Sequence, residues 1–254
     1  MNQELRILWL YPSILNLHGE RGNAMACVRV CEQIGVKPIL TRIDRLGSPI
    51  DLESADLILI GPGELAVMDA VVGALSPYAQ RMSELVDAGK PVFVTGTSAA
   101  IVARETQRTD SSRIPGLGLL DMVVVEREEI LGDDLIVNAD GQELGGMQIR
   151  MTDLHLYPRQ APFASVLYGL GNARQPDFEG ARRANLVATN LLGPALTKNP
   201  WFARYLIDQA LIHRYGEAPN VPEKDLWALE RQSAAVIRRF NATKTIVPGT
   251  LRRL

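Results

Sequence analysis

The first hundred residues alternate between short apolar runs and amphipathic stretches. The apolar runs have the length of strands and lie at residues 6–12, 37–44, 55–61 and 91–96. Residues 23–34 and 76–89 have helical patterns. Because such alternation is typical of a parallel sheet covered by helices, we predict an α/β fold with a central, mostly parallel sheet.

The second of these helices has signals at both ends. Ser76 stands where an N-cap residue is expected, Pro77 stands in the first turn, and Gly89 follows the last turn. We therefore predict that the helix starts at Ser76 and stops at Gly89.

The second half of the chain changes character. Short strand candidates follow one another at residues 122–128, 134–140, 147–152, 164–169 and 185–192, and a helical pattern covers residues 200–215. We expect these strands to add an antiparallel extension to the same sheet, within one domain of residues 1–216.

Residues 217–254 form a tail with a different pattern. An amphipathic stretch at residues 226–240 places Leu226, Leu229, Ala234 and Ile237 near helical spacing, with three arginines off that face. The apolar face either packs back on the domain, which we favour, or docks on a partner.

Composition narrows the class of protein. The 254 residues are 46% hydrophobic with a formal net charge of −2, which is enough for a full core and gives no sign of nucleic-acid or membrane binding. No basic region followed by an apolar stretch opens the chain, so we expect a cytoplasmic protein. Cys27 and Cys31 are the only cysteines, and we expect both to be small buried hydrophobic residues on one helix face. We therefore expect no metal site, disulfide or cofactor.

Five segments carry a family resemblance. They are LYPSILNLHGERGN (residues 10–23), GLGLLD (116–121), YGLGN (168–172), FEG (178–180) and LLGPALTKNP (191–200). In this order and at these distances the chain resembles the GatD-type glutaminase subunit of lipid II isoglutaminyl synthase, a relative of the CobB/CobQ-like amidotransferase domains. The resemblance implies a class I glutamine amidotransferase fold, which is flavodoxin-like, and a Mur-ligase-like (MurT-type) partner that amidates the peptidoglycan stem peptide.

The catalytic positions that this resemblance implies hold unsuitable residues. The family presents a cysteine nucleophile on an elbow between a strand and a helix, and that place falls on Gly96 in PVFVTGTSAA. The family's histidine lies before the Gly-Pro of LLGPALTKNP, which is Leu192 here. Because glycine cannot attack and leucine cannot accept a proton, we expect no catalytic residues at these degenerate positions.

Two further places differ from the family's pattern. The arginine that holds the substrate carboxylate is replaced by Glu129, whose charge would repel that carboxylate. Residues 145–153 lack the Glu-Asn-His-Gly character of the corresponding loop.

Other residues could still line a ligand pocket. We name Gly63, Glu64, Thr97, Ser98, Glu129 and Gln148 as candidates. Residues 61–64 form a glycine turn in the family's oxyanion-hole place, which we interpret chiefly as a backbone requirement, with Gly63 allowing close approach. Thr97 and Ser98 are expected to cap the following helix, where they could bind a small anion.

The sequence gives little reason to expect that one of the three histidines acts as a base for a relocated nucleophile. We expect His18 to pack or cap, His213 to face solvent, and His155 to lie near the pocket without a catalytic role. The loop with His18, Gly19, Arg21 and Asn23 is either partner-facing or structural, and Arg21 then pairs with Glu20 or another acid.

Three functions follow as hypotheses. The first is a catalytically inactive GatD-type subunit that pairs with a Mur-ligase-like protein. The second is an active amidotransferase with a relocated nucleophile such as Ser98. The third is a sensor that binds an amino acid or anion in the old pocket.

Overall fold

A central six-stranded sheet organises the molecule. The computed structural model describes residues 3–173, 177–222 and 226–243. The strand order is β11-β12-β4-β3-β1-β2, with β1 (Glu4–Leu10), β2 (Lys37–Ile43), β3 (Leu57–Ile60), β4 (Val92–Thr95) and β12 (Leu186–Thr189) parallel and β11 (Ala181–Arg183) antiparallel at the edge. The predicted parallel sheet is confirmed.

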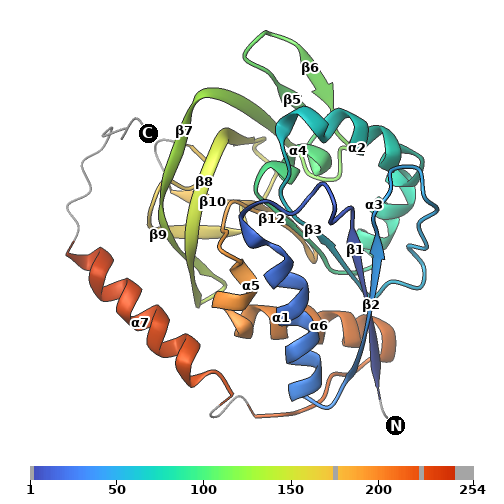
Figure 1. The fold of residues 1–254 in the computed structure, drawn as a ribbon, viewed down its shortest axis with the longest axis vertical. Helices are drawn as coiled ribbons and strands as arrows, with labels where there is room; N and C mark the ends of the chain where they lie inside the picture. Colours follow the sequence, from blue (N-terminus) through green and yellow to red (C-terminus); the bar gives the residue numbers. More distant parts are fainter. Residues whose placement is uncertain (1–2, 174–176, 223–225, 244–254) are drawn as a thin grey trace.

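Both faces of the inner strands β3, β4 and β12 are buried, and successive side chains along each strand point to opposite sides. In β3, Ile58 and Ile60 belong to the cluster that includes α2 (Met68–Leu75), α3 (Ala79–Asp87) and α4 (Ala99–Val102). Leu57 and Leu59 belong to the cluster that includes α1 (Arg21–Gln33) and α6 (Pro200–Tyr215). The sheet is therefore a layer between two helical layers (Figure 1).

Most of the antiparallel strands form a second sheet, so their predicted place in the first sheet is wrong. Its order is β10-β9-β7-β5-β6, with β8 also paired to β7. The bounds are β5 (Glu105–Gln107), β6 (Arg113–Pro115), β7 (Met122–Ala139), β8 (Gln142–Leu156), β9 (Ala164–Tyr168) and β10 (Phe178–Glu179). An isolated bridge between Met147 and Leu192 links β8 to the segment after β12.

The strands predicted at residues 122–128 and 134–140 are two parts of β7. A bulge between Glu126 and Leu131 separates them, and this irregularity hid the continuity of the strand in the sequence. Asp140 and Gly141 have positive φ values of 50° and 85° at the turn into β8, as a tight Asp-Gly hairpin requires.

The sequence predicts both ends of α6 and the end of α3 correctly, but not the start of α3. Helix α6 covers residues 200–215 as predicted, and Gly89 has a φ of +96° just after α3. Ser76 does not cap α3: its hydroxyl donates to the Gly73 carbonyl oxygen (2.9 Å) at the end of α2, an apolar helix that the sequence pattern did not reveal.

The tail forms helix α7 (Ala228–Ala242), which contacts the domain. Trp227 is 2% exposed, and Ala234 packs against the cluster that includes α1 and α6. Leu229 was predicted on the packed face, but it is 77% exposed. Figure 1 shows α7 as an outlying helix beside the β7–β8 hairpin.

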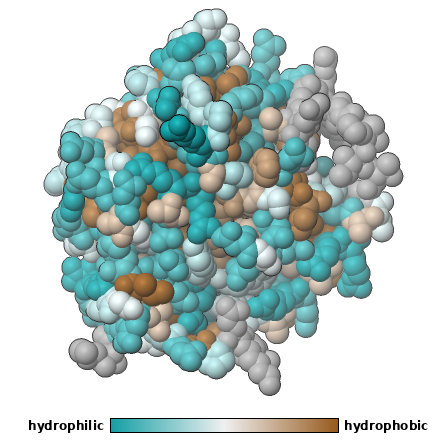
Figure 2. All heavy atoms as spheres, turned by 180° about the vertical axis from the view of Figure 1, so that it is seen from behind, coloured by the Kyte–Doolittle hydropathy of each residue, from teal (hydrophilic) through white to brown (hydrophobic). Residues whose placement is uncertain are grey.

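The face of the molecule seen from behind is mostly hydrophilic (Figure 2). Figure 2 shows the back of the molecule, where apolar side chains form small separate patches. Among the residues described, no helix is both long and apolar enough to cross a bilayer. Cys27 and Cys31 are buried free thiols, as the sequence indicates.

Gly116, the first residue of GLGLLD, has a steric role that we expect a substitution to expose. A Cβ there would lie 2.1 Å from the Ala103 carbonyl oxygen. Gly116→Ala should therefore destabilise the fold by roughly 2 kcal/mol in urea unfolding. Gly73→Ala is the control, because Gly73 lies in α2 with nothing within 4 Å of an added Cβ, and it should stabilise by roughly 0.5–1 kcal/mol. Equal midpoints for the two variants would contradict this role.

Candidate functional site

The turn after β4 has the geometry of a nucleophile elbow. Strand β4 ends at Thr95, Gly96 opens the short helix η4 (Gly96–Ser98), and α4 follows. The φ of Gly96 is +58°, which a side chain occupies only with strain. The backbone of an elbow is thus present, with no nucleophile on it.

Gly96 and Leu192 are neighbours in space. A Cβ at Gly96 would lie 3.4 Å from Leu192 Cδ2 and 3.0 Å from Pro62 Cβ. Leu192 is 1% exposed and exchanges two backbone hydrogen bonds with Met147 (3.1 and 2.8 Å). The two positions that the family resemblance assigns to nucleophile and base therefore lie close together, and the Leu192 side chain packs near Gly96.

The Gly63 N–H, which is the candidate oxyanion donor, already donates a hydrogen bond within the protein. The Gly63 N–H donates to Thr97 Oγ1 (3.2 Å), and the Thr97 hydroxyl donates back to the Gly63 carbonyl oxygen (2.5 Å). Gly63 does permit close approach, since a Cβ there would lie 2.8 Å from the Ile14 carbonyl oxygen. Glu64 next to it is exposed.

The Ser98 hydroxyl makes a hydrogen bond with a structural role. Its side chain is fully buried, and its hydroxyl donates to the Gly61 carbonyl oxygen (2.6 Å). Neither Ser98 nor Thr97 makes a side-chain cap of the following helix, so the predicted capping is wrong. Both hydroxyls instead tie the elbow to the turn after β3.

The three histidines lie on the surface. His155 is exposed on β8 and His213 is exposed on α6, the second as predicted. His18 is exposed with a φ of +58°, and among the described residues its side chain makes no hydrogen bond to a helix end, so its predicted packing or capping role is wrong. None of the three hydrogen-bonds to Ser98 among the described residues.

The remaining pocket candidates lie on the second sheet. Glu129 is exposed in the β7 bulge, 3.8 Å from the Arg127 guanidinium, which also pairs with Asp153 (2.5 Å). Gln148 is fully buried, and its amide donates to the Gly171 carbonyl oxygen (2.6 Å). Gln148 therefore holds the YGLGN segment against β8.

Glu179 of the FEG segment is a buried carboxylate that the sequence did not single out. It accepts hydrogen bonds from the Thr189 hydroxyl (2.8 Å) and the Asn190 N–H (2.6 Å). Burial raises the pKa of Glu179 to about 7. Asn172 of YGLGN exchanges two hydrogen bonds with Gly180 (2.9 and 2.6 Å), so both motifs converge on the turn before Leu192.

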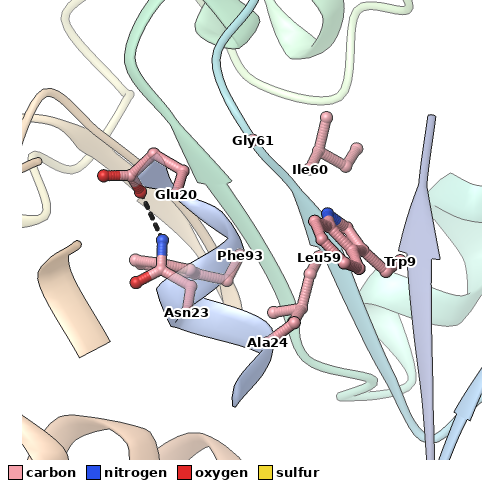
Figure 3. Close-up of a pocket in the computed structure, with 8 residues that line it drawn as sticks. All are labelled: Trp9, Glu20, Asn23, Ala24, Leu59, Ile60, Gly61 and Phe93. Carbon is pink, nitrogen blue, oxygen red and sulfur yellow. Dashed lines mark hydrogen bonds between the residues drawn. The ribbon is translucent and has the colours of Figure 1, made fainter. Parts of the chain in front are cut away.

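Glu20 holds the same turn from the other side. Its carboxylate accepts the Gly193 N–H (3.0 Å) and the Asn23 amide, and Asn23 Oδ1 accepts the Leu196 N–H (2.8 Å). Figure 3 shows Glu20, directly before α1, and Asn23 on α1, beside a small cavity that reaches Trp9 and Phe93. Burial raises the pKa of Glu20 to about 6.

The loop before α1 is exposed at its tip and structural at its end. Gly19 and Arg21 are exposed, whereas Asn23 is buried. The Arg21 N–H donates to Asn16 Oδ1 (2.8 Å). Within the described ranges Arg21 forms no ion pair, so the predicted pairing with Glu20 is wrong, because the Glu20 carboxylate faces Gly193.

Two known proteins are similar to the chain over most of its length. No protein-family model matches the chain. It is 24% identical over 222 residues to "Lipid II isoglutaminyl synthase (glutamine-hydrolyzing) subunit GatD" of Streptococcus pneumoniae, covering 86% of this chain and 85% of the relative. It is 25% identical over 243 residues to the protein of the same name from Staphylococcus aureus, covering 95% and 98%.

Solved structures support the fold. A glutamine amidotransferase matches with a TM-score of 0.53 and 18% identity, over 80% of this chain and 98% of that one. A putative GMP synthase component from Thermoplasma acidophilum matches with a TM-score of 0.50 and 13% identity, over 83% and 96%. The chain therefore has the fold of glutamine amidotransferases and is similar to GatD proteins over most of its length.

The two buried carboxyls should make stability depend on pH. Because the pKa of Glu179 is about 7 in the folded state against an ordinary 4.5, the folded state retains a proton that the unfolded chain releases. The contribution of Glu179 to stability is then greatest below about pH 4.5, and it falls by roughly 3 kcal/mol as the pH rises through 7. Glu179→Gln should remove most of that fall, measured by urea unfolding between pH 5 and 8.

Glu84→Gln is the matched control for this measurement. A hydrogen bond from Arg81 lowers the pKa of Glu84, so it titrates below the tested range and the slope should stay as in the wild type. A wild-type slope in Glu179→Gln would show that Glu179 does not titrate as described.

Proposed function

We propose that this chain is a GatD-type subunit without glutaminase activity, which pairs with a Mur-ligase-like partner in the amidation of the peptidoglycan precursor lipid II. The observation that carries the proposal is the proximity of Gly96 and Leu192 at a turn with the backbone of an elbow: a Cβ at Gly96 would lie 3.4 Å from Leu192 Cδ2. The relatives are named as subunits of a lipid II isoglutaminyl synthase, which supports both the pathway and the need for a partner.

Hydrolysis of a carboxamide needs three groups that this elbow does not supply. A nucleophile must attack the carbonyl carbon, a base must take its proton, and N–H donors must stabilise the oxyanion. Here the attacking position is a glycine and the base position is a buried leucine. The Gly63 N–H is engaged by Thr97.

A relocated nucleophile has no support in the described geometry. Ser98 is the nearest hydroxyl with a favourable sequence context, but it donates to the Gly61 carbonyl oxygen in a fully buried position. A serine becomes nucleophilic only when a base accepts its proton, and a carbonyl oxygen does not do so. The inactive subunit is therefore the favoured interpretation.

The nitrogen donor then distinguishes this protein from a glutamine-hydrolysing relative. A partner that still amidates would use free ammonia, because no ammonia is released from glutamine at this elbow. The chain would contribute binding and structural support to the partner.

A two-donor assay tests the proposal. Purified chain and a Mur-ligase-like protein of the same organism are mixed with ATP and lipid II, and then with either glutamine or ammonium chloride. We expect an amidated product with ammonium chloride and none with glutamine. The pneumococcal synthase, which is named as glutamine-hydrolysing, is the positive control for glutamine use. Product or glutamate formed from glutamine by this pair would refute the inactive assignment.

A further inference from the structure

Arg150 lies on the buried face of β8 and is 3% exposed. Its Nη1 donates to the Thr152 carbonyl oxygen and to Asp153 Oδ1. Its Nε and Nη2 are also buried, and neither has a hydrogen-bond partner among the described residues. One whole edge of this buried guanidinium is therefore left unsatisfied by the described part of the chain.

Arg204 on α6 shows how the same protein satisfies a buried guanidinium. It is 7% exposed, and its Nε donates to both carboxylate oxygens of Asp208 (2.7 and 2.8 Å). Its Nη2 donates to the Pro219 carbonyl oxygen (2.6 Å) and its Nη1 to the Val221 carbonyl oxygen (3.3 Å). Because a buried charged donor without an acceptor is costly, we expect Nε and Nη2 of Arg150 to meet an acceptor that the described chain does not supply.

The charges around Arg150 favour an anion as that acceptor. Asp153 accepts hydrogen bonds from both Arg150 and Arg127 (2.5 Å for Arg127), so two guanidinium groups share one buried carboxylate. Arg127 also lies 3.8 Å from Glu129, which is exposed. Glu179 is the other buried acid close enough to affect Arg150, but its oxygens accept hydrogen bonds from other groups. The surplus of positive charge attracts an anion more strongly than a neutral water molecule.

The shape of the unsatisfied edge indicates the class of anion. Nε and Nη2 are on the same side of the planar guanidinium and present two parallel N–H donors. Such a pair matches the two oxygens of a carboxylate, whereas a spherical ion has a single centre. Gln148 is on the same face of β8, two residues before Arg150, and its Oε1 is also buried without a described partner.

Burial limits the size of the ligand, and a bulge interrupts the sheet beside it. Strands β7 and β8 lie side by side (Figure 1), with Arg150 opposite Leu131 and Thr152 opposite Glu126. Residues 127–130 of β7 therefore bulge out between these pairs, and residues 128–130 are exposed. With Arg150 almost fully buried, a ligand that enters beside this bulge has only a few atoms.

We propose that the Nε–Nη2 edge of Arg150 binds a small monocarboxylate of the size of formate or acetate. The site uses a side chain of β8, and not position 129, where the family resemblance places the arginine that holds the substrate. It uses neither Gly96 nor Leu192, so the inference does not depend on the proposed function.

Nuclear magnetic resonance of the arginine Nε–H groups tests the site directly. The full chain, labelled with ¹⁵N, is titrated with sodium formate while sodium chloride is lowered to keep the ionic strength constant. We expect the Arg150 signal, identified by its loss in Arg150→Lys, to move to higher proton frequency and to saturate, because its N–H gains a charged acceptor. The Arg204 signal should stay in place, since Asp208 already occupies that Nε.

Calorimetric titration of two matched variants with formate gives the second measurement. Arg150→Lys should weaken formate binding at least about tenfold, because an ammonium group keeps the charge but lacks the pair of parallel donors. Arg204→Lys changes the other buried arginine and should leave the affinity unchanged. Urea unfolding shows whether each variant is folded, and the wild-type spectra test the site even if Arg150→Lys is not.

Three results would overturn the inference. An Arg150 signal that stays in place, or that moves without saturating, would show that no carboxylate binds this edge. A change of the same size with chloride replacing another inert anion would show a general response to anions. Wild-type formate affinity in a folded Arg150→Lys would place the bound carboxylate elsewhere. The proposed function stands in each case, because the two-donor assay tests it separately.

Discussion

The turn from Thr189 to Gly193 depends on two buried carboxyls that hold it from opposite sides. Glu179 accepts hydrogen bonds from Thr189 and Asn190, and Glu20 accepts one from Gly193. Burying a carboxyl is costly unless donors surround it, so each acid fixes the donors that satisfy it. This turn places Leu192 against the elbow. It also pairs Leu192 with Met147, and that pairing connects the two sheets.

This arrangement gives the family-like motifs a structural role. The HGERGN segment contributes Glu20 and Asn23, and FEG contributes Glu179. Their described roles are structural, because each satisfies backbone groups of a neighbouring segment. Leu192 suits this setting: full burial of a leucine contributes about 1.5–3 kcal/mol, whereas a buried histidine without a partner would be unfavourable. The elbow is thus a packed junction that these contacts hold in place.

Much of the fold could be predicted from local patterns. Helix α6 begins at Pro200 and ends before Gly216, which has a φ of +79°, so both of its boundaries are set by residues with strong local preferences. The second sheet was misplaced because strand pairing is a long-range property. Ser76 was misread because the apolar helix α2 before it lacks a polar face in sequence.

The position of the candidate site could be predicted from the sequence, but most of its hydrogen bonds could not. The neighbouring places of Gly96 and Leu192 came from the motifs around them, and the structure brings the two together. The partners of Thr97, Ser98 and Glu20 lie 34, 37 and 173 positions away, and no local pattern encodes such contacts. Leu229 was assigned to the packed face because helical spacing alone does not tell which of two apolar faces meets the domain.

Covalent trapping is the most direct measurement of the central claim. The purified chain, alone and with its Mur-ligase-like partner, is incubated with a chloroketone analogue of glutamine, which alkylates a cysteine or histidine side chain in a glutamine-binding active site. Intact mass spectrometry should show an unchanged chain, with the pneumococcal relative labelled as the positive control. A stoichiometric adduct that glutamine protects against, mapped to any residue of this chain, would contradict the account of an elbow without a nucleophile.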